Sequence, residues 1–228
     1  MRLSILLFDG FTTLDAIGGY EVLARLPGAE VEFFARRKGT IAADTRRLGL
    51  CAWRDFDDVQ STDILYVPGG PGGVALEQDP VHLEKIRALD ATSTWTVGIC
   101  NGVALLGAAG VLNGHAATTN WFHRHRLAAF GAEFKPVRYH RSGKYVTGAG
   151  VSASIDTALF LANEIGGEQL AKTLQLGIEY YPAPPFPERA PEDAPDYAQK
   201  MVAAFEKKGG AQLLAQSAPF HTLAAAAE

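Results

Sequence analysis

The chain has 228 residues, of which 47% are hydrophobic, so it can bury one substantial core and is expected to form a single domain. Its formal net charge is −4, and the Lys and Arg residues are scattered along the sequence. This pattern excludes the clustered basic surface that is typical of nucleic-acid or anionic-membrane binding, and it favours a small-molecule partner. With neither a secretory signal pattern nor a segment long enough to span a bilayer, the sequence predicts a cytoplasmic protein.

Short apolar runs alternate with amphipathic helical stretches along the chain. This alternation predicts an α/β fold with a mostly parallel sheet and helices on both faces. The expected strands cover residues 3–8, 31–36, 64–67 and 96–99, and the expected crossover helices cover residues 14–26 and 80–89. Two small hairpins, one of residues 40–43 and 48–52 and one around Ser142–Gly143, are expected to decorate the main sheet.

The second half of the chain is predicted to be mainly helical. Helices are expected over residues 101–109, 153–165, 169–176 and 195–207, with glycines ending the first two. The proline-rich run at 180–187 cannot be helical and should form an extended surface arm. We therefore expect one α/β domain over residues 1–207 and a partly frayed C-terminal tail over residues 208–228.

Cys100 lies where an apolar strand runs into a helix of small and aliphatic residues, in the pattern Gly-x-Cys-x-Gly. An arbitrary cysteine is more often a buried packing residue. Here, however, Gly98 and Gly102 allow a strained apex and a close approach of strand and helix, as in a nucleophile elbow. The helix N-terminus should favour the thiolate. The second cysteine, Cys51, lacks this context and is expected to be a buried strand residue, with no disulfide between the two.

A glycine-rich loop follows the strand at 64–67. In a parallel sheet it should lie at the carboxyl edge beside the elbow, where ligands bind. The amides of Gly69 and Gly70, together with that of Asn101, are candidates for stabilising negative charge on a substrate. Many glycine-rich loops are only turns, and this one lacks the spacing of a nucleotide phosphate site.

Asp15 stands in an otherwise apolar stretch shortly after the first strand. Such a carboxylate is either a helix cap or a functional acid. Its place at the carboxyl edge of the first strand favours the functional interpretation.

These pieces together resemble the DJ-1/PfpI superfamily, and within it the group of isocyanide (isonitrile) hydratases. The resemblance extends to about Phe186. It is carried by Leu-Asp near residue 15, Pro-Gly-Gly at 68–70, Ile-Cys-x-Gly at 99–102, Leu-Gly-Ala-Ala-Gly at 106–110, Ala-Thr-Thr-x-Trp at 117–121, Thr-Gly-x-Gly-x-x-Ala-x-Ile-Asp at 147–156 and Pro-Ala-Pro-Pro-Phe at 182–186.

The resemblance implies a flavodoxin-like homodimer that hydrates isocyanides to N-substituted formamides as a hydro-lyase, with neither metal nor cofactor. Cys100 would be the nucleophile and Asp15 the acid–base partner. The chain departs from the family pattern in two places, where Asn101 replaces the usual Thr after the nucleophile and Asn120 replaces the usual His before the tryptophan. The side chain of Asn101 can still donate a hydrogen bond.

Other functions would leave different signals in the sequence. The histidines show no metal-ligand spacing, since His123 and His125 would diverge on a helix, and no His-x-Glu pattern of a glutamine amidotransferase appears late in the chain. A glyoxalase or amidohydrolase and a redox-protective protein of the DJ-1 kind stay open, because each also needs a reactive cysteine. A regulator of the AraC type would need a helix-turn-helix region, which we do not expect here.

Overall fold

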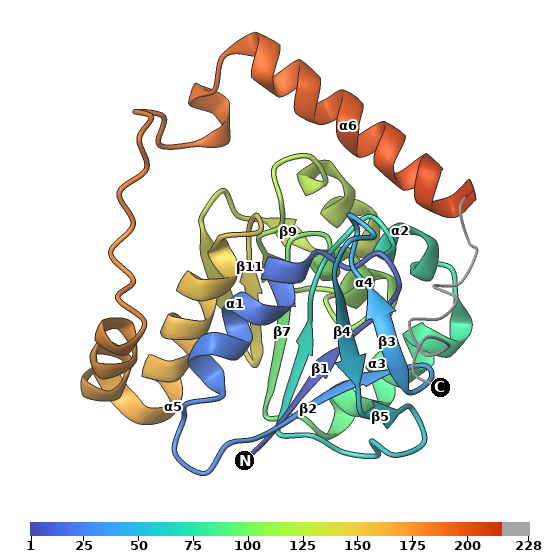
Figure 1. Ribbon diagram of the computed structural model, residues 1–228, viewed down its shortest axis with the longest axis vertical. Coiled ribbons are helices and arrows are strands. Elements are labelled where there is room, and N and C mark those ends of the chain that lie inside the picture. Colours follow the sequence, from blue (N-terminus) through green and yellow to red (C-terminus); the bar gives the residue numbers. More distant parts are fainter. Residues whose placement is uncertain (216–228) are drawn as a thin grey trace, which may run out of the picture.

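The computed structural model describes the backbone of residues 1–215 and the side-chain environment of residues 1–207. Its centre is a seven-stranded sheet (Figure 1). From one edge to the other the strands are β10 (Tyr139–Ser142), β11 (Tyr145–Gly148), β7 (Trp95–Ile99), β6 (Ile64–Val67), β1 (Arg2–Leu6), β2 (Glu30–Ala35) and β5 (Arg54–Asp55). Every neighbouring pair is parallel except β10 with β11. The predicted flavodoxin-like α/β class is confirmed.

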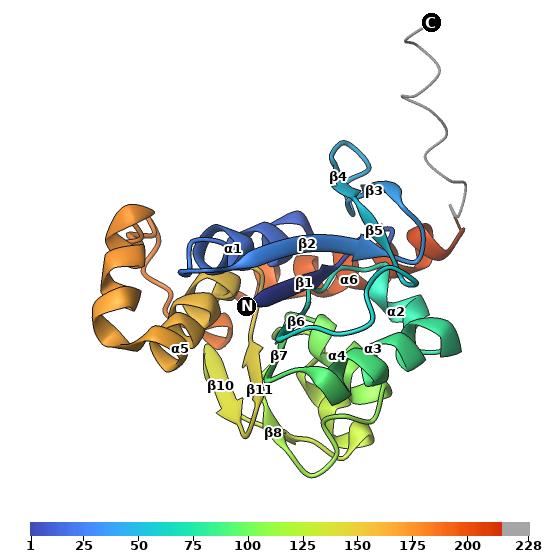
Figure 2. The same cartoon turned by 90° about the horizontal axis from the view of Figure 1, so that it is seen from below.

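Helices cover both faces of this sheet (Figure 2). One face carries α1 (Thr13–Leu23) and α5 (Ala153–Gly177), and the other carries α2 (Gly73–Leu76), α3 (Pro80–Thr92) and α4 (Gly102–Ala108). The central strands β1 and β6 are buried on both sides, and all four residues of β6 are fully enclosed. Burial on both faces explains why these strands are continuous apolar runs rather than alternating ones.

The strand order reverses between β1 and β6, because the chain moves from β1 outward to β2 and then returns to β6 on the other side. In an open α/β sheet, such a switch point creates a crevice at the carboxyl ends of the strands. The segments that follow β1, β6 and β7 all enter this edge.

One expected hairpin is confirmed and the other is corrected. β3 (Gly39–Ala42) and β4 (Gly49–Ala52) pair as a separate antiparallel hairpin. The segment around Ser142–Gly143 is not a decoration, because β11 pairs in parallel with β7 and extends the main sheet. The sequence shows the turn between β10 and β11 but not the neighbour that β11 chooses. A further small sheet joins β8 (Ala116–Ala117) to β9 (Glu133–Phe134), and a 3-10 helix spans Arg124–Phe130.

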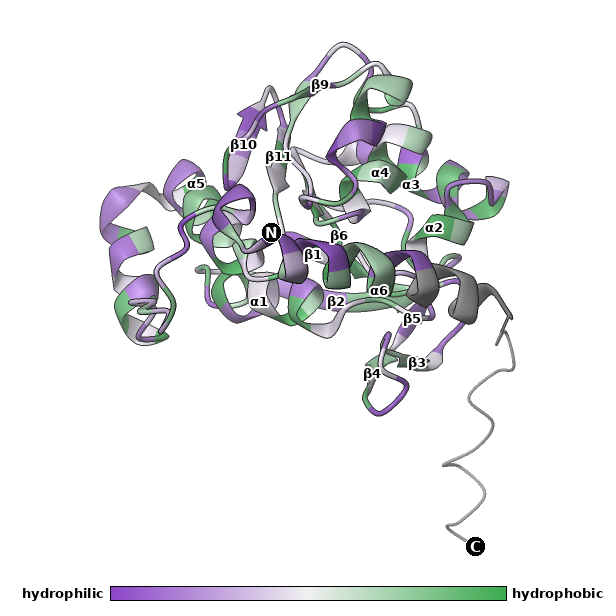
Figure 3. Ribbon diagram, turned by 90° about the horizontal axis from the view of Figure 1, so that it is seen from above, coloured by the Kyte–Doolittle hydropathy of each residue, from purple (hydrophilic) through white to green (hydrophobic). Residues whose placement is uncertain are grey.

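The last third of the chain leaves the sheet and returns across it. α5 is broken at Gly167, whose φ of 81° and ψ of 170° are non-helical, so the two helices expected on either side of Gly166–Gly167 meet at a kink. The proline-rich arm that follows is exposed and has no regular structure until a short turn at Pro191–Asp193. α6 (Asp196–Ala215) then crosses above the carboxyl ends of the strands (Figures 1 and 3).

α6 is longer than the helix expected over residues 195–207. Residues 208–215 of the predicted tail belong to it, and residues 216–228 lie outside the described part of the chain. Among residues 1–215, no helix combines the length and hydrophobicity needed to cross a membrane.

Candidate active site

Cys100 occupies the turn between β7 and α4, with a φ of 55°. This left-handed conformation is costly for a residue with a side chain, so the surroundings must hold it. The Cys100 amide donates to the carbonyl of Gly148 at 3.1 Å, and the hydroxyl of Thr119 donates to the carbonyl of Cys100 at 2.6 Å. Both backbone polar groups are therefore engaged, and the predicted strained elbow is present.

The glycine that follows Cys100 allows α4 to approach the sheet. A Cβ at Gly102 would press against the carbonyl oxygen of Val67 and lie 2.5 Å from that of Pro68. Atoms at this separation overlap, so a larger residue would push α4 away from the β6 loop. The small residue is thus needed to bring the elbow and the glycine-rich loop together.

Asp15 lies in the first turn of α1, fully buried, and close enough to Cys100 for its charge to act on the pKa of the thiol. Its Oδ2 accepts a hydrogen bond from the amide of Gly69 at 2.8 Å. Burial raises the pKa of Asp15 from 3.8 to about 7, the Gly69 amide partly opposes this shift, and the nearby charge of Asp44 adds to it. The structure places the predicted acid beside the predicted nucleophile.

The thiol of Cys100 is held in its protonated form. Burial raises the pKa of Cys100 well above its ordinary value, and the adjacent charge of Asp15 raises it further. The side-chain amide of Asn120 and the backbone N–H of Asn101 oppose these effects without overcoming them. The expectation that the helix N-terminus would favour a thiolate is therefore wrong for the resting protein, because desolvation and a neighbouring carboxylate outweigh the helix terminus.

Asn120 contacts the predicted nucleophile directly, a role that the sequence did not predict. Its Nδ2 donates to Cys100 Sγ at 3.1 Å, and its Oδ1 accepts from the backbone N–H of His123 at 2.8 Å. The second bond fixes the orientation of the amide, so that its N–H faces the sulfur. Asn120 follows β8 in an irregular segment, and its only signal in the sequence was its departure from the family pattern.

The loop amides have partners inside the protein. The amide of Gly70 donates to Asn101 Oδ1 at 2.6 Å, and Asn101 Nδ2 donates back to the carbonyl of Gly70 at 2.9 Å. Because the Gly69 amide is held by Asp15, neither predicted donor is available in the resting state. The two glycines instead orient Asp15 and Asn101, which places all five predicted site residues in one cluster.

α6 lies over this cluster. The charge of its Glu206 contributes to the raised pKa values of both Asp15 and Cys100, behind the larger effects of burial. Cys100 is only 6% exposed. The reactive centre is therefore closed from bulk solvent in this conformation.

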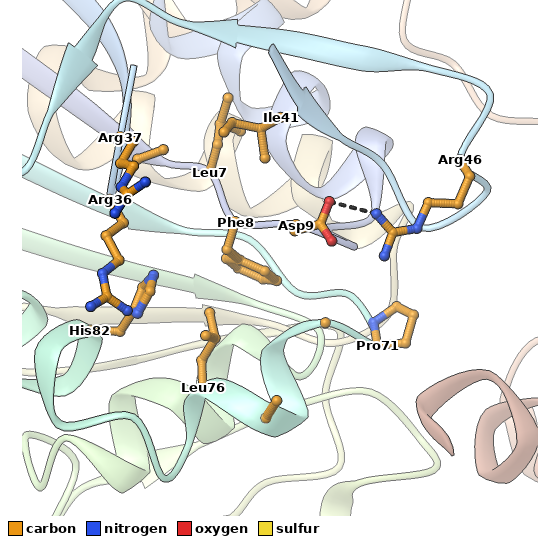
Figure 4. Close-up of a pocket in the computed structure, with 13 residues that line it drawn as sticks. Leu7, Phe8, Asp9, Arg36, Arg37, Ile41, Arg46, Pro71, Leu76 and His82 are labelled. Carbon is orange, nitrogen blue, oxygen red and sulfur yellow. Dashed lines mark hydrogen bonds and ion pairs between the residues drawn. The ribbon is translucent and has the colours of Figure 1, made fainter. Parts of the chain in front are cut away.

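A separate pocket of about 490 Å³ lies at the carboxyl ends of β1 and β2 (Figure 4). Phe8, Ile41 and Leu76 form its apolar wall, and Arg46 pairs with Asp9 at its rim with a distance of 2.6 Å. It shares Pro71 and Gly72 with the glycine-rich loop but does not include Cys100 or Asp15. In the described part of the chain, no group of three or more His, Cys, Asp or Glu side chains could hold a metal ion.

A doubly wound α/β fold with a cysteine elbow and a buried carboxyl beside the sulfur defines the class of this protein. The chain belongs to the DJ-1/PfpI family, whose model matches residues 1–164. It is similar to the isonitrile hydratase of Pseudomonas putida, with 38% identity over 207 residues that cover 89% of this chain and 90% of that protein.

Solved structures agree with the family assignment. A ThiJ/PfpI family protein from Pseudomonas syringae superposes with a TM-score of 0.85 and 31% identity, over 93% of this chain and 90% of that one. Drosophila melanogaster DJ-1beta superposes with a TM-score of 0.71 over 79% of this chain and 98% of that one. At 19% identity, the second likeness shows the fold alone.

Proposed function

We propose that this protein hydrates isonitriles to N-substituted formamides, with Cys100 as the nucleophile. The observation that carries the proposal is the buried Asp15 carboxyl beside the protonated Cys100 thiol, with a pKa raised to about 7. The similarity to isonitrile hydratase over most of both chains supports the same assignment.

The first step joins the sulfur to the terminal carbon of the isonitrile. Asp15 takes the proton of the thiol as Sγ attacks, and it returns that proton to the same carbon, which would otherwise become a carbanion. The product is a thioimidate, in which the carbon carries one hydrogen and is bonded to both sulfur and nitrogen. A carboxyl with a pKa near 7 suits both transfers, because it is neither a strong acid nor a strong base at neutral pH.

The second step adds water to the thioimidate carbon. Asp15 accepts a proton from the water and passes it to the nitrogen, giving a tetrahedral carbon that bears hydroxyl, amine and sulfur. Collapse forms the carbonyl and breaks the carbon–sulfur bond, and the hydroxyl proton passes through Asp15 to the sulfur as the formamide leaves. Asn120 stabilises the sulfur as it carries charge, and Asn101, with Gly69 and Gly70, keeps Asp15 and the loop in register.

The test follows the infrared stretch of an aryl isonitrile as purified protein consumes it. We expect Cys100→Ala and Cys100→Ser to abolish turnover. Cys51→Ser should leave it largely intact, because Cys51 lies in the β3–β4 hairpin, opposite Thr40. Loss of activity in a folded Cys51→Ser variant, or turnover by Cys100→Ala, would overturn the assignment.

The proposal extends to the cofactor requirement, the location and the oligomeric state of the protein. The chemistry balances with water alone, so we propose a hydro-lyase that needs neither metal nor cofactor. A thiol nucleophile suits a reducing compartment, and we propose the cytoplasm. We also propose a homodimer, for which the exposed aromatic residues of the arm and α6 provide an apolar surface.

A further inference from the structure

Asp15, beside Cys100, and two residues that follow Asn120 carry unpaired buried polar atoms. In the part of the chain whose side chains are described, the buried side-chain nitrogen and oxygen atoms without a hydrogen-bond partner are Asp15 Oδ1, Trp121 Nε1 and His123 Nδ1. Buried polar atoms are normally satisfied, so each unpaired one calls for an explanation. Asp15 is explained by the reaction, but Trp121 and His123 have no part in it.

Both unexplained residues line one groove. It has a volume of about 680 Å³, with the segment from Trp121 to Arg126 as one wall and Ala203 and Lys207 of α6 as the other. His123 is only 8% exposed. α6 is lightly attached, since none of its residues up to Lys207 is fully buried. A ligand can therefore enter by a local displacement of this helix.

One side chain links the groove to the sulfur, although neither Cys100 nor Asn120 lines the groove itself. Asn120 donates to Cys100 Sγ and accepts from the backbone N–H of His123, which is a groove residue. The charge of Glu206, next to Lys207 on α6, also acts on Cys100 and Asp15. An isonitrile is linear, so when its carbon meets the sulfur its substituent must extend away from Sγ towards a neighbouring surface.

The chemistry of the groove restricts what that substituent carries. Trp121 Nε1–H can only donate, so it requires an acceptor on the ligand. Burial, and then the charges of Arg126 and His125, lower the pKa of His123 to about 4, so its ring is neutral near pH 7 and can donate or accept. The guanidinium carbon of Arg124 lies 5.6 Å from the centroid of the Trp121 ring, and the ring of Phe122 adds an aromatic surface.

We propose that the groove between residues 121–126 and α6 binds the N-substituent of the isonitrile, and that Trp121 and His123 select aromatic substituents with a hydroxyl or similar hydrogen-bonding group. The inference rests on the proposed function and names its substrate class. Without substrate, Trp121 Nε1 and His123 Nδ1 lack hydrogen-bond partners, and the hydroxyl of the substrate would pair with them.

The experiment compares two isonitriles of nearly equal size, 4-(hydroxymethyl)phenyl isocyanide and 4-ethylphenyl isocyanide. We expect kcat/KM to favour the hydroxyl compound by about 10-fold or more, because the apolar analogue leaves the buried polar atoms unpaired. Trp121→Phe and His123→Phe should each remove most of this preference by lowering kcat/KM for the hydroxyl compound. His123→Asn, which keeps a polar atom near the Nδ1 position, should restore part of it.

Trp53→Phe is the matched control, since Trp53 is 75% exposed and does not line the groove. It should leave the preference unchanged. Equal kcat/KM values for the two compounds in the wild type, or equal losses for both in Trp121→Phe, would overturn the inference while turnover of the ethyl compound still supported the proposed function. If neither compound were consumed in a Cys100-dependent reaction, the proposed function itself would fall, and this inference with it.

Discussion

In the proposed mechanism, one proton moves between Cys100 and Asp15. Burial raises the pKa of both groups, and the charge of Asp15 raises the pKa of Cys100 further, so the pair resists carrying two negative charges. Attack on an uncharged isonitrile suits such a pair, because the proton leaves the sulfur only as the new carbon–sulfur bond forms.

Asp15→Asn tests this role directly. Asparagine has nearly the same shape and can still accept from the Gly69 amide, so the variant should fold. It cannot move a proton, and we expect kcat to fall by about 100-fold or more, the usual scale for a lost general acid–base group. Steady-state rates with an aryl isonitrile check this, and near-normal turnover would exclude the mechanism.

The same substitution should change how stability depends on pH. The folded protein binds the Asp15 proton more tightly than the unfolded chain, since its pKa is about 7 rather than 3.8. The contribution of Asp15 to the free energy of unfolding is therefore fully present below about pH 4. It is lost as the pH rises to about 7, by roughly 4 kcal/mol at ~1.4 kcal/mol per pKa unit.

Asp15→Asn carries no such penalty, so it should gain stability relative to the wild type as the pH rises from 4 to 7.5. Urea unfolding of both proteins at several pH values measures the difference. A difference that did not vary with pH would mean that the carboxyl is not held neutral by the fold.

At the scale of the elements, the elbow depends on close contact between α4 and the loop after β6. Gly102→Ala places a Cβ against the carbonyls of Val67 and Pro68, so we expect loss of activity together with a lower melting temperature. Gly150→Ala is the control, because no atom lies within 4 Å of the added Cβ. Comparable damage from both variants would show that glycine at 102 has no special role.

The sequence predicted the elbow because its signal is local, with two glycines flanking a cysteine where an apolar strand ends. It could not predict that β11 pairs with β7, since register between distant strands depends on packing across the whole sheet. The same limit applies to Asn120, which reaches Sγ only because an irregular segment folds back over the elbow. The sequence also placed the amides of Gly69 and Gly70 at the correct edge of the sheet. It could not predict that they bond to Asp15 and Asn101, because residue spacing does not give the direction of a side chain.

At the scale of the whole molecule, α6 carries an exposed apolar stripe. Tyr197, Met201 and Phe205 are four residues apart and about 70% exposed, so they lie along one face of the helix. Large apolar surfaces on a folded chain commonly mark an interface. We assign this stripe to the proposed homodimer.

Sedimentation at micromolar concentration should give the mass of a dimer, and Phe205→Glu should shift the protein towards the monomer. Val81→Asp is the control, because it adds a charge at a 40% exposed position on α3. A monomeric wild type would contradict the prediction. A dimer unaffected by Phe205→Glu would place the interface elsewhere.

The protonated, buried thiol of Cys100 also affects how easily oxidants and alkylating compounds modify the protein. Those compounds react with free thiolates that water can reach, and this sulfur is neither ionised nor open. In the proposed reaction, the sulfur loses its proton only while it attacks a neutral molecule bound under α6. In the proposed reaction, burial and the charge of Asp15 would therefore protect the resting thiol, which would become reactive only with substrate bound.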